Sequence, residues 1–118
     1  MFFYLPAFSF AQPAIYFNEV RHDFGKVSQG DKIEYVFEFS NKGDQSLIIE
    51  KISPSWGCAA AMASSSRLEP REKGKIIVNV DTKGKSGNIH KTVQVYTNDP
   101  AIPITVLSLI MQIEEIVY

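Results

Sequence analysis

The hydrophobic and polar residues alternate most regularly from Ile33 to Phe39. All odd positions there are large and apolar, whereas the even positions are polar except for Val36. Successive side chains of a β-strand point to opposite faces, so a period of two gives one apolar and one polar face. The pattern therefore predicts a strand, which a polar turn at 41–44 connects to a second strand beginning at Leu47.

The rest of the chain consists of further short apolar segments separated by turn residues, and no segment has a helical period. Strands are predicted at 19–27, 46–53, 75–81, 89–97 and 102–114. The first of these is expected to be an edge strand with a bulge at Gly25. Segment 55–66 is expected to form a loop or a weak edge strand, because nothing in it is long enough to nucleate a helix. Strands of this length and spacing predict an all-β fold, an antiparallel β-sandwich of about seven strands.

The last predicted strand, 102–114, is apolar on both faces. One face carries Ile104, Val106 and Ile110, and the other carries Leu107, Leu109, Met111 and Ile113. Because the outer face of a two-layer sandwich should be polar, we expect the second set to lie beneath the N-terminal segment or in contact with another chain. The alternatives are cover by the chain's own loops, or a bulge that exchanges the two faces. Leu107, Leu109 and Met111 are therefore candidate interaction residues.

The composition limits the possible functions. With 118 residues the chain fits one domain, and its 12 Lys and Arg against 13 Asp and Glu provide no positive surplus for binding nucleic acid. Cys58 is the single cysteine in the sequence, which excludes an intrachain disulfide. No pattern indicates a cofactor or a small-molecule ligand, so we expect the partner to be another protein.

The N-terminal residues indicate the cellular location. Residues 1–11 are uncharged and mostly apolar, and small residues occupy the −3 and −1 positions of a cut before Gln12. This pattern is typical of the second half of a secretory signal peptide, and the run is too short, and too interrupted by a proline, for a transmembrane span. We predict a periplasmic or secreted protein with a tether at 12–18 and a single domain at 19–118. The alternative is that residues 1–11 form a strand packed on the domain.

Few residues offer catalytic chemistry. Cys58 would need a base or positive neighbours to act as a nucleophile, and a buried, inert thiol is the alternative interpretation. The two histidines, His22 and His90, show no metal-ligand spacing, and we interpret them as outward-facing strand residues. We therefore predict no catalytic residue, no metal site and no enzyme activity.

Five lysines gather in the second half of the chain: Lys73, Lys75, Lys83, Lys85 and Lys91. Acidic residues lie among them, which is typical of a solvated, turn-rich end where lysines protect the strand edges. Binding of an anionic glycan or a lipid headgroup is the alternative function for this cluster.

Turn and strand motifs over residues 20–113 together resemble those of a known family. The matching residues are Asp23–Val27, Gly30–Asp31, Phe37–Asp44, Leu47–Ile49, Ile52, Gly57–Cys58, Pro70, Glu72–Gly74, Ile76, Gly84, Gly87, Lys91–Val93, Val95 and Thr97–Pro100. In their order and spacing they resemble the bacterial DUF1573 domain, an immunoglobulin-like sandwich of unknown function similar to the ASPM/SPD-2/Hydin and major-sperm-protein modules. The resemblance implies an immunoglobulin-like fold for the predicted sandwich.

The chain departs from the pattern of this family at two places. The family carries Cys-Gly-Cys-Thr where this chain has Trp56-Gly57-Cys58-Ala59, so a paired-thiol role cannot be transferred to it. Arg71 replaces the glycine of a Pro-Gly-Glu turn, and because arginine resists positive φ we expect a different turn type there.

These observations favour a non-enzymatic module for protein interaction or structural support. By analogy with related sandwiches, it would bind a partner protein through an exposed edge strand or through the loop around Trp56. Two alternatives are a glycan-binding module that uses Trp56 and a redox or metal site at Cys58. The candidate interaction residues are Trp56, Cys58, Leu107, Leu109 and Met111.

Overall fold

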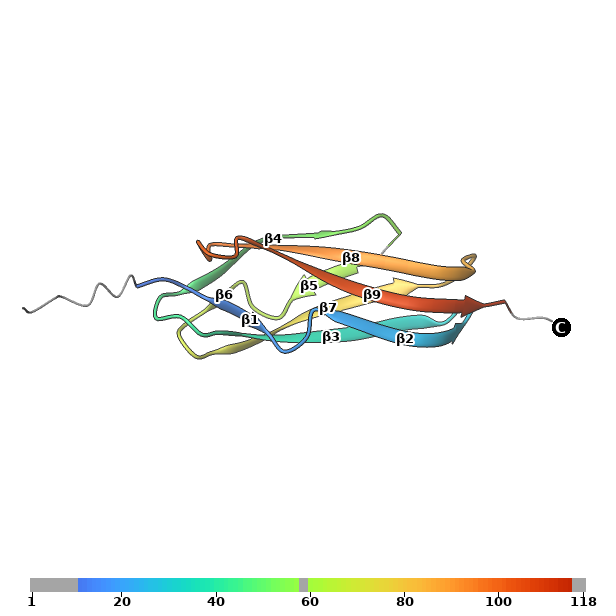
Figure 1. The fold of residues 1–118 in the computed structure, drawn as a ribbon, viewed down its shortest axis with the longest axis horizontal. Coiled ribbons are helices and arrows are strands. Elements are labelled where there is room, and N and C mark those ends of the chain that lie inside the picture. The colour runs from blue at the N-terminus through green and yellow to red at the C-terminus, as the bar shows by residue number, and fades with distance from the viewer. Residues whose placement is uncertain (1–10, 58–59, 116–118) are drawn as a thin grey trace, which may run out of the picture.

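The computed structural model describes residues 11–57 and 60–115, whose regular structure consists of β-strands in two facing sheets (Figure 1). The four-stranded sheet has the spatial order β1 (Ile15–Phe17), β3 (Lys32–Asn41), β7 (Lys73–Asp81) and β5 (Ala60–Ala63). The five-stranded sheet has the order β2 (Arg21–Ser28), β9 (Ile104–Glu114), β8 (Gly87–Thr97), β4 (Leu47–Pro54) and β6 (Arg67–Leu68). The predicted all-β sandwich is confirmed. None of the residues described forms a helix that is long and apolar enough to cross a membrane.

One strand pair departs from the predicted antiparallel arrangement. β2 and β9 run parallel, whereas the other ladders between described strands are antiparallel. The chain crosses between β1 and β2 from one sheet to the other, so β2 comes to lie beside β9 in the same direction. The bulge expected in this edge strand is confirmed, because the register shifts between Asp23 and Lys26, and Gly25 has a φ of +68°.

The core lies between the sheets, where the alternation in the sequence places it. Phe37 and Phe39 of β3 point inward and are 0% and 1% exposed. The buried apolar residues of both sheets are Ile15, Phe17, Phe37, Phe39, Leu47, Ile49, Leu68, Ile76, Val78, Val80, Val93, Val95, Leu107, Leu109, Met111 and Ile113. Removing one such side chain from water contributes about 1.5–3 kcal/mol, so this set supplies most of the favourable free energy of folding.

In β9, the apolar face that was expected on the outside of the sandwich lies in the core, and the other apolar face lies outside. Leu107 lies opposite Val93 of β8, whose side chain is in the core, so Leu107, Leu109 and Met111 also face the core. They are 0%, 0% and 1% exposed and cannot contact a partner, so the prediction that they form an interaction surface is wrong. The exposed apolar side chains of this strand are Ile104 and Val106 on the outer face, each 46% exposed.

The predicted tether at 12–18 contains a strand of the sandwich. Ile15 and Phe17 of β1 are buried, and β1 pairs with the end of β3. The buried carboxylate of Asp99 explains why so short a strand docks. Its Oδ2 accepts the Ile15 N–H at 2.9 Å, while its Oδ1 accepts the N–H groups of Ala101 at 2.8 Å and Ile102 at 3.1 Å. Asp99 therefore joins β1 to the turn between β8 and β9, and the tether prediction is wrong for these residues.

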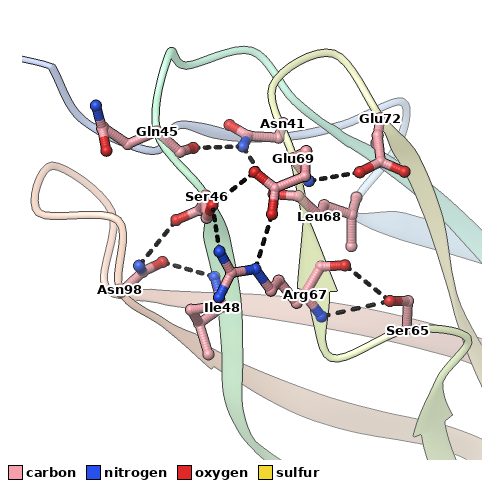
Figure 2. Close-up of polar contacts among 10 residues, drawn as sticks. All are labelled: Asn41, Gln45, Ser46, Ile48, Ser65, Arg67, Leu68, Glu69, Glu72 and Asn98. Carbon is pink, nitrogen blue, oxygen red and sulfur yellow. Dashed lines mark hydrogen bonds and ion pairs between the residues drawn. The ribbon is translucent and has the colours of Figure 1, made fainter.

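At the end of the sandwich near β6, the side chains of two asparagines form hydrogen bonds with main-chain groups (Figure 2). Asn98 accepts the Ile48 N–H at 2.8 Å and donates to the Ser46 carbonyl at 3.1 Å, so it holds the start of β4. Asn41 is fully buried and donates to the Leu68 carbonyl at 3.1 Å, which joins β3 to β6. A buried amide is stable there because its polar atoms have partners.

Side chains also hold the two-residue strand β6 against β4 (Figure 2). Arg67 Nε donates to Glu69 Oε1 at 2.7 Å, and Ser46 Oγ donates to Glu69 Oε2 at 2.7 Å. The hydrogen bond from Arg67 has the largest effect on the pKa of Glu69 and the one from Ser46 the next largest, and both hold this pKa below its ordinary value. An exposed ion pair contributes little stability, so its role is to fix the position of β6.

The turn at 69–72 keeps the conformation that a glycine would give it. Arg71 has a φ of +71°, and the Glu72 N–H donates to the Glu69 carbonyl at 3.0 Å. Proline fixes a negative φ at the second position, so a positive φ at the third position defines a type II turn. The expectation of a different turn type is therefore wrong. The strain is offset by hydrogen bonds, among them the 2.8 Å bond from the Arg71 N–H to the Asn41 carbonyl.

Candidate functional site

The outer side of β5 has no paired strand in the part of the chain that the structure describes, although β4 of the other sheet lies close to β5. β5 is the last strand of the four-stranded sheet and pairs with β7 from Ala60, opposite Asn79, to Ala63, opposite Ile76. On its other side no ladder joins β5 to a further strand in the part of the chain that the structure describes. An edge of this kind presents unpaired N–H and C=O groups to solvent and to other chains.

The hydrogen-bond pattern shows which main-chain groups face this edge. The Ser64 N–H donates to the Lys75 carbonyl at 2.8 Å, so the main chain of Ser64 points toward β7. These groups alternate in direction along a strand, so Ala61 and Ala63 direct their N–H and C=O groups to the free side. The side chains of both alanines pack against the core, while that of Met62 points outward and is 59% exposed. The edge therefore offers two residues for pairing with an exposed apolar side chain between them.

The other edges carry features that oppose strand pairing. β2 has charged side chains at Arg21, Asp23 and Lys26 together with its bulge. β6 has only two residues, one of them Arg67, and β1 has three. β5 is also short, with four residues, but it contains only alanine and methionine, with no charge, no proline and no register shift. Charges, bulges and short length are the features by which proteins block their edges, so β5 is the least protected of the four.

The loop around Trp56 presents a second candidate surface. The Trp56 side chain is 94% exposed. Its main chain is nevertheless fixed, since Lys91 Nζ donates to the Trp56 carbonyl at 2.8 Å and Lys85 Nζ donates to the Gly57 carbonyl at 2.6 Å. Gly57 has a φ of +91°, which an L-residue rarely adopts. The arrangement holds an indole ring in solvent on a main chain that is anchored at Trp56 and Gly57.

Four of the five lysines predicted as one cluster are divided between two places, and the fifth, Lys83, is exposed and lies at neither. Lys85 and Lys91 hold the Trp56 loop, whereas Lys73 and Lys75 lie on the outer face of the four-stranded sheet. Together with Lys42 they line an open groove of about 580 Å³. A positively charged groove of this size can accept an anionic group, so it is a third candidate surface.

A cluster around His22 was not anticipated from the sequence. The imidazole stacks on Tyr35 with ring centroids 4.1 Å apart, and Nδ1 lies 3.6 Å from Glu19 Oε2. The Tyr35 hydroxyl donates to the same carboxylate group. His22 is therefore half-buried rather than outward-facing, while His90 is exposed as expected. No sequence signal reveals the cluster, because it depends on the crossing between the sheets before β2.

Two sequence predictions concern residues outside the described ranges. One is the signal peptide predicted at 1–11, of which only residue 11 is described, and the other is the role of Cys58. In the ranges 11–57 and 60–115, no three His, Cys, Asp or Glu residues are close enough to hold a metal ion. The described residues form three candidate binding surfaces, which are the β5 edge, the Trp56 loop and the lysine groove.

The sequence matches one family model, that of a protein of unknown function (DUF1573), over residues 15–110. No curated protein matches the sequence. The structure is similar to that of a protein of unknown function from Porphyromonas gingivalis W83, with a TM-score of 0.76 and 18% identity over 91% of this chain and 50% of that one. This chain therefore spans half the length of that protein.

Two further structures support the same fold. The ASH / PapD-like domain of human CEP192 has a TM-score of 0.69 and 14% identity over 99% of this chain and 96% of that one. The periplasmic chaperone SfaE has a TM-score of 0.54 and 10% identity over 89% of this chain and 61% of that one. Proteases and glycoside hydrolases are also among the similar structures, but this chain covers at most 32% of each of them. Similarity at these identities establishes an immunoglobulin-like, PapD-like fold.

Proposed function

Because this chain belongs to the DUF1573 family, whose function is unknown, we propose a function from its own structure. It is a non-enzymatic module that binds a partner protein by accepting a strand at the free edge of β5. The observation that carries the proposal is the unpaired, uncharged edge at Ala61 and Ala63. Strand addition to an exposed sheet edge is a recurring mode of peptide recognition, in which main-chain hydrogen bonds give affinity and alternate side chains give specificity.

The number of main-chain groups sets the strength of this contact. Ala61 and Ala63 each offer one N–H and one C=O to an incoming strand. A hydrogen bond contributes about 0.5–1.5 kcal/mol net, so the main chain alone supplies a few kcal/mol. Further affinity would come from apolar contact with Met62, whose side chain is exposed beside the edge. We expect a short contact of weak to moderate affinity, which a larger interface would strengthen.

A periplasmic or secreted location is part of the proposal. It is supported by the apolar residues 2–10 and the small residues before Gln12, which are typical of a secretory signal peptide. A periplasmic chaperone among the similar structures has a related fold. Cell fractionation tests this location: recovery of the protein in the cytoplasm would contradict it.

Site-specific photo-cross-linking tests the interaction. A photoreactive residue would replace Met62, Trp56 or Val106 in three separate variants, which are then irradiated in intact cells. These positions report on the β5 edge, on the Trp56 loop and on the outer face of β9, and all three side chains are exposed. The proposal predicts a recurring protein adduct from position 62. Adducts from position 56 or 106 without one from position 62 would contradict it.

A second candidate function is favoured by Trp56. An exposed indole on an anchored main chain is suited to stacking on a sugar ring, so a glycan is the alternative partner. Trp56 is the single tryptophan of the chain, so its fluorescence reports on this site alone. Under this alternative, polysaccharide changes the emission, and Trp56→Ala abolishes binding without affecting the unfolding curve. Unchanged emission across a panel of polysaccharides would exclude it.

A further inference from the structure

The lysine groove begins at the place where β5 ends. Ser64 is the residue that follows β5, and its N–H makes the last bond to β7, at the Lys75 carbonyl. The chain then crosses to β6 in the other sheet, which begins at Arg67. Ser64, Lys73 and Lys75 all line the groove. A strand that adds to β5 and continues past Ser64 therefore reaches it.

The groove has a surplus of positive charge. Lys42, Lys73 and Lys75 line it together with a single acidic residue, Glu38, so three positive charges face one negative charge and the surplus is two. The Glu38 carboxylate also accepts a hydrogen bond from the Asn18 side chain at 3.3 Å. No ion pair involves Lys73 or Lys75 within the described residues. Both ammonium groups are thus available to an anionic partner.

We infer that the segment that pairs with β5 carries acidic residues at the end that enters this groove. Its main chain bonds Ala61 and Ala63, and its carboxylates then pair with Lys75 and Lys73. A strand advances about 3.3 Å per residue, so the acidic positions lie roughly two to four residues beyond the last paired one. They precede the paired residues if the added strand is antiparallel to β5 and follow them if it is parallel.

This inference rests on the proposed function, and it adds the chemical character of the partner to it. Exposed ion pairs are worth little individually and are screened by salt, so they select a partner more than they strengthen the complex. Two such pairs give a preference of about three- to tenfold for an acidic over a neutral segment at low salt.

Peptide titrations followed by NMR of the ¹⁵N-labelled chain test the inference. The probes are synthetic peptides with an alternating Thr-Val strand and a pair of Asp residues at one end or the other. The matched controls replace each Asp pair by Asn, which keeps the shape and removes the charge. The protein variants are Lys73→Gln with Lys75→Gln, and Lys83→Gln as a control, because Lys83 is exposed and does not line the groove.

We expect both the Asp and the Asn peptides to shift the amide signals of residues 60–63. One Asp peptide should bind about three- to tenfold more tightly than its Asn control. The double variant Lys73→Gln with Lys75→Gln should remove this difference in affinity. Lys83→Gln should leave it unchanged. Equal affinity of the Asp and Asn peptides, with shifts at 60–63, would overturn the inference while strand addition stands. Shifts at Lys73 and Lys75 without shifts at 60–63 would show a general anion site and overturn it as well. Peptides that shift neither region would contradict strand addition itself.

Discussion

Asp99→Asn should weaken the docking of β1 on the sandwich, because it changes one buried hydrogen-bonding group with little change in volume. In the native protein the carboxylate accepts three main-chain N–H groups, one from Ile15 and two from Ala101 and Ile102. An asparagine can keep its oxygen toward the two N–H groups of the turn. Its amide nitrogen then faces the Ile15 N–H, so that two donors oppose each other.

The magnitude follows from the bond that is lost. A hydrogen bond to a charged group contributes about 1.5–3 kcal/mol, and a buried donor left without a partner costs about 1–3 kcal/mol. These values describe the same lost contact, so we expect the free energy of unfolding to fall by about 2–3 kcal/mol. With a urea m-value of about 1–3 kcal/mol per M, the unfolding midpoint falls by roughly 0.7–3 M.

Urea unfolding followed by circular dichroism measures the change, and amide exchange at Ile15 locates it. Asp44→Asn is the matched control, since Asp44 is exposed and accepts one N–H, from Gln12, which an asparagine oxygen can also accept. That variant should change stability by less than about 0.5 kcal/mol. A loss below about 0.5 kcal/mol for Asp99→Asn, or unchanged exchange at Ile15, would refute the assigned role of Asp99.

Three further predictions address the core, the strained turn and the pH dependence. Phe37→Ala removes a ring that is 0% exposed and should cost about 3–5 kcal/mol in urea unfolding; a small change would mean that the inner face of β3 is misassigned. Arg71→Gly relieves a positive φ and should raise stability by at most about 1 kcal/mol, whereas a clear loss would show that Arg71 is not strained. Glu69 should titrate below its ordinary pKa of 4.5 by NMR, so its contribution to stability is present above that pH and is lost as the pH falls below it. Arg67→Gln should move the titration of Glu69 toward the ordinary value, and an unchanged midpoint would contradict the assigned cause.

The strands that the sequence predicts well are those with a strong period of two. The alternation around Phe37 and in the segment with Val78 leaves one assignment of faces, and the structure confirms it. β9 is different because both of its faces are apolar, so the pattern is the same for either choice. Its inner face is decided by pairing, in which Leu107 lies opposite Val93. The pairing of β9 with β8 cannot be predicted from the residues of β9 alone.

The short or strained elements depend on contacts between residues that are distant in the sequence. β1 has three residues, too few for a periodic signal, and its N–H bond to Asp99 joins residues 84 positions apart. Arg71 lies in the turn between β6 and β7, and it keeps a glycine-like conformation because its main chain is bonded to Asn41 of β3. Propensity describes the isolated residue and cannot include such a contact.

For the candidate site, the sequence predicted either a loop or a weak edge strand within 55–66, and it singled out Trp56. It did not predict the direction of the free main-chain groups of β5, which follows from the register with β7. It also did not separate the lysines that hold the Trp56 loop from those that line the groove, because their positions depend on which face of the sheet each one occupies.

Amide hydrogen exchange at Ala61 and Ala63, measured in the free chain and in complex with the partner recovered by cross-linking, tests the central claim most directly. Strand addition predicts fast exchange of both amides in the free chain and at least about tenfold slower exchange in the complex. The Trp56 indole signal should remain unchanged. Unchanged exchange at both alanines in a complex that does form would contradict strand addition at β5, and a shifted Trp56 signal in the same sample would place the contact at the Trp56 loop.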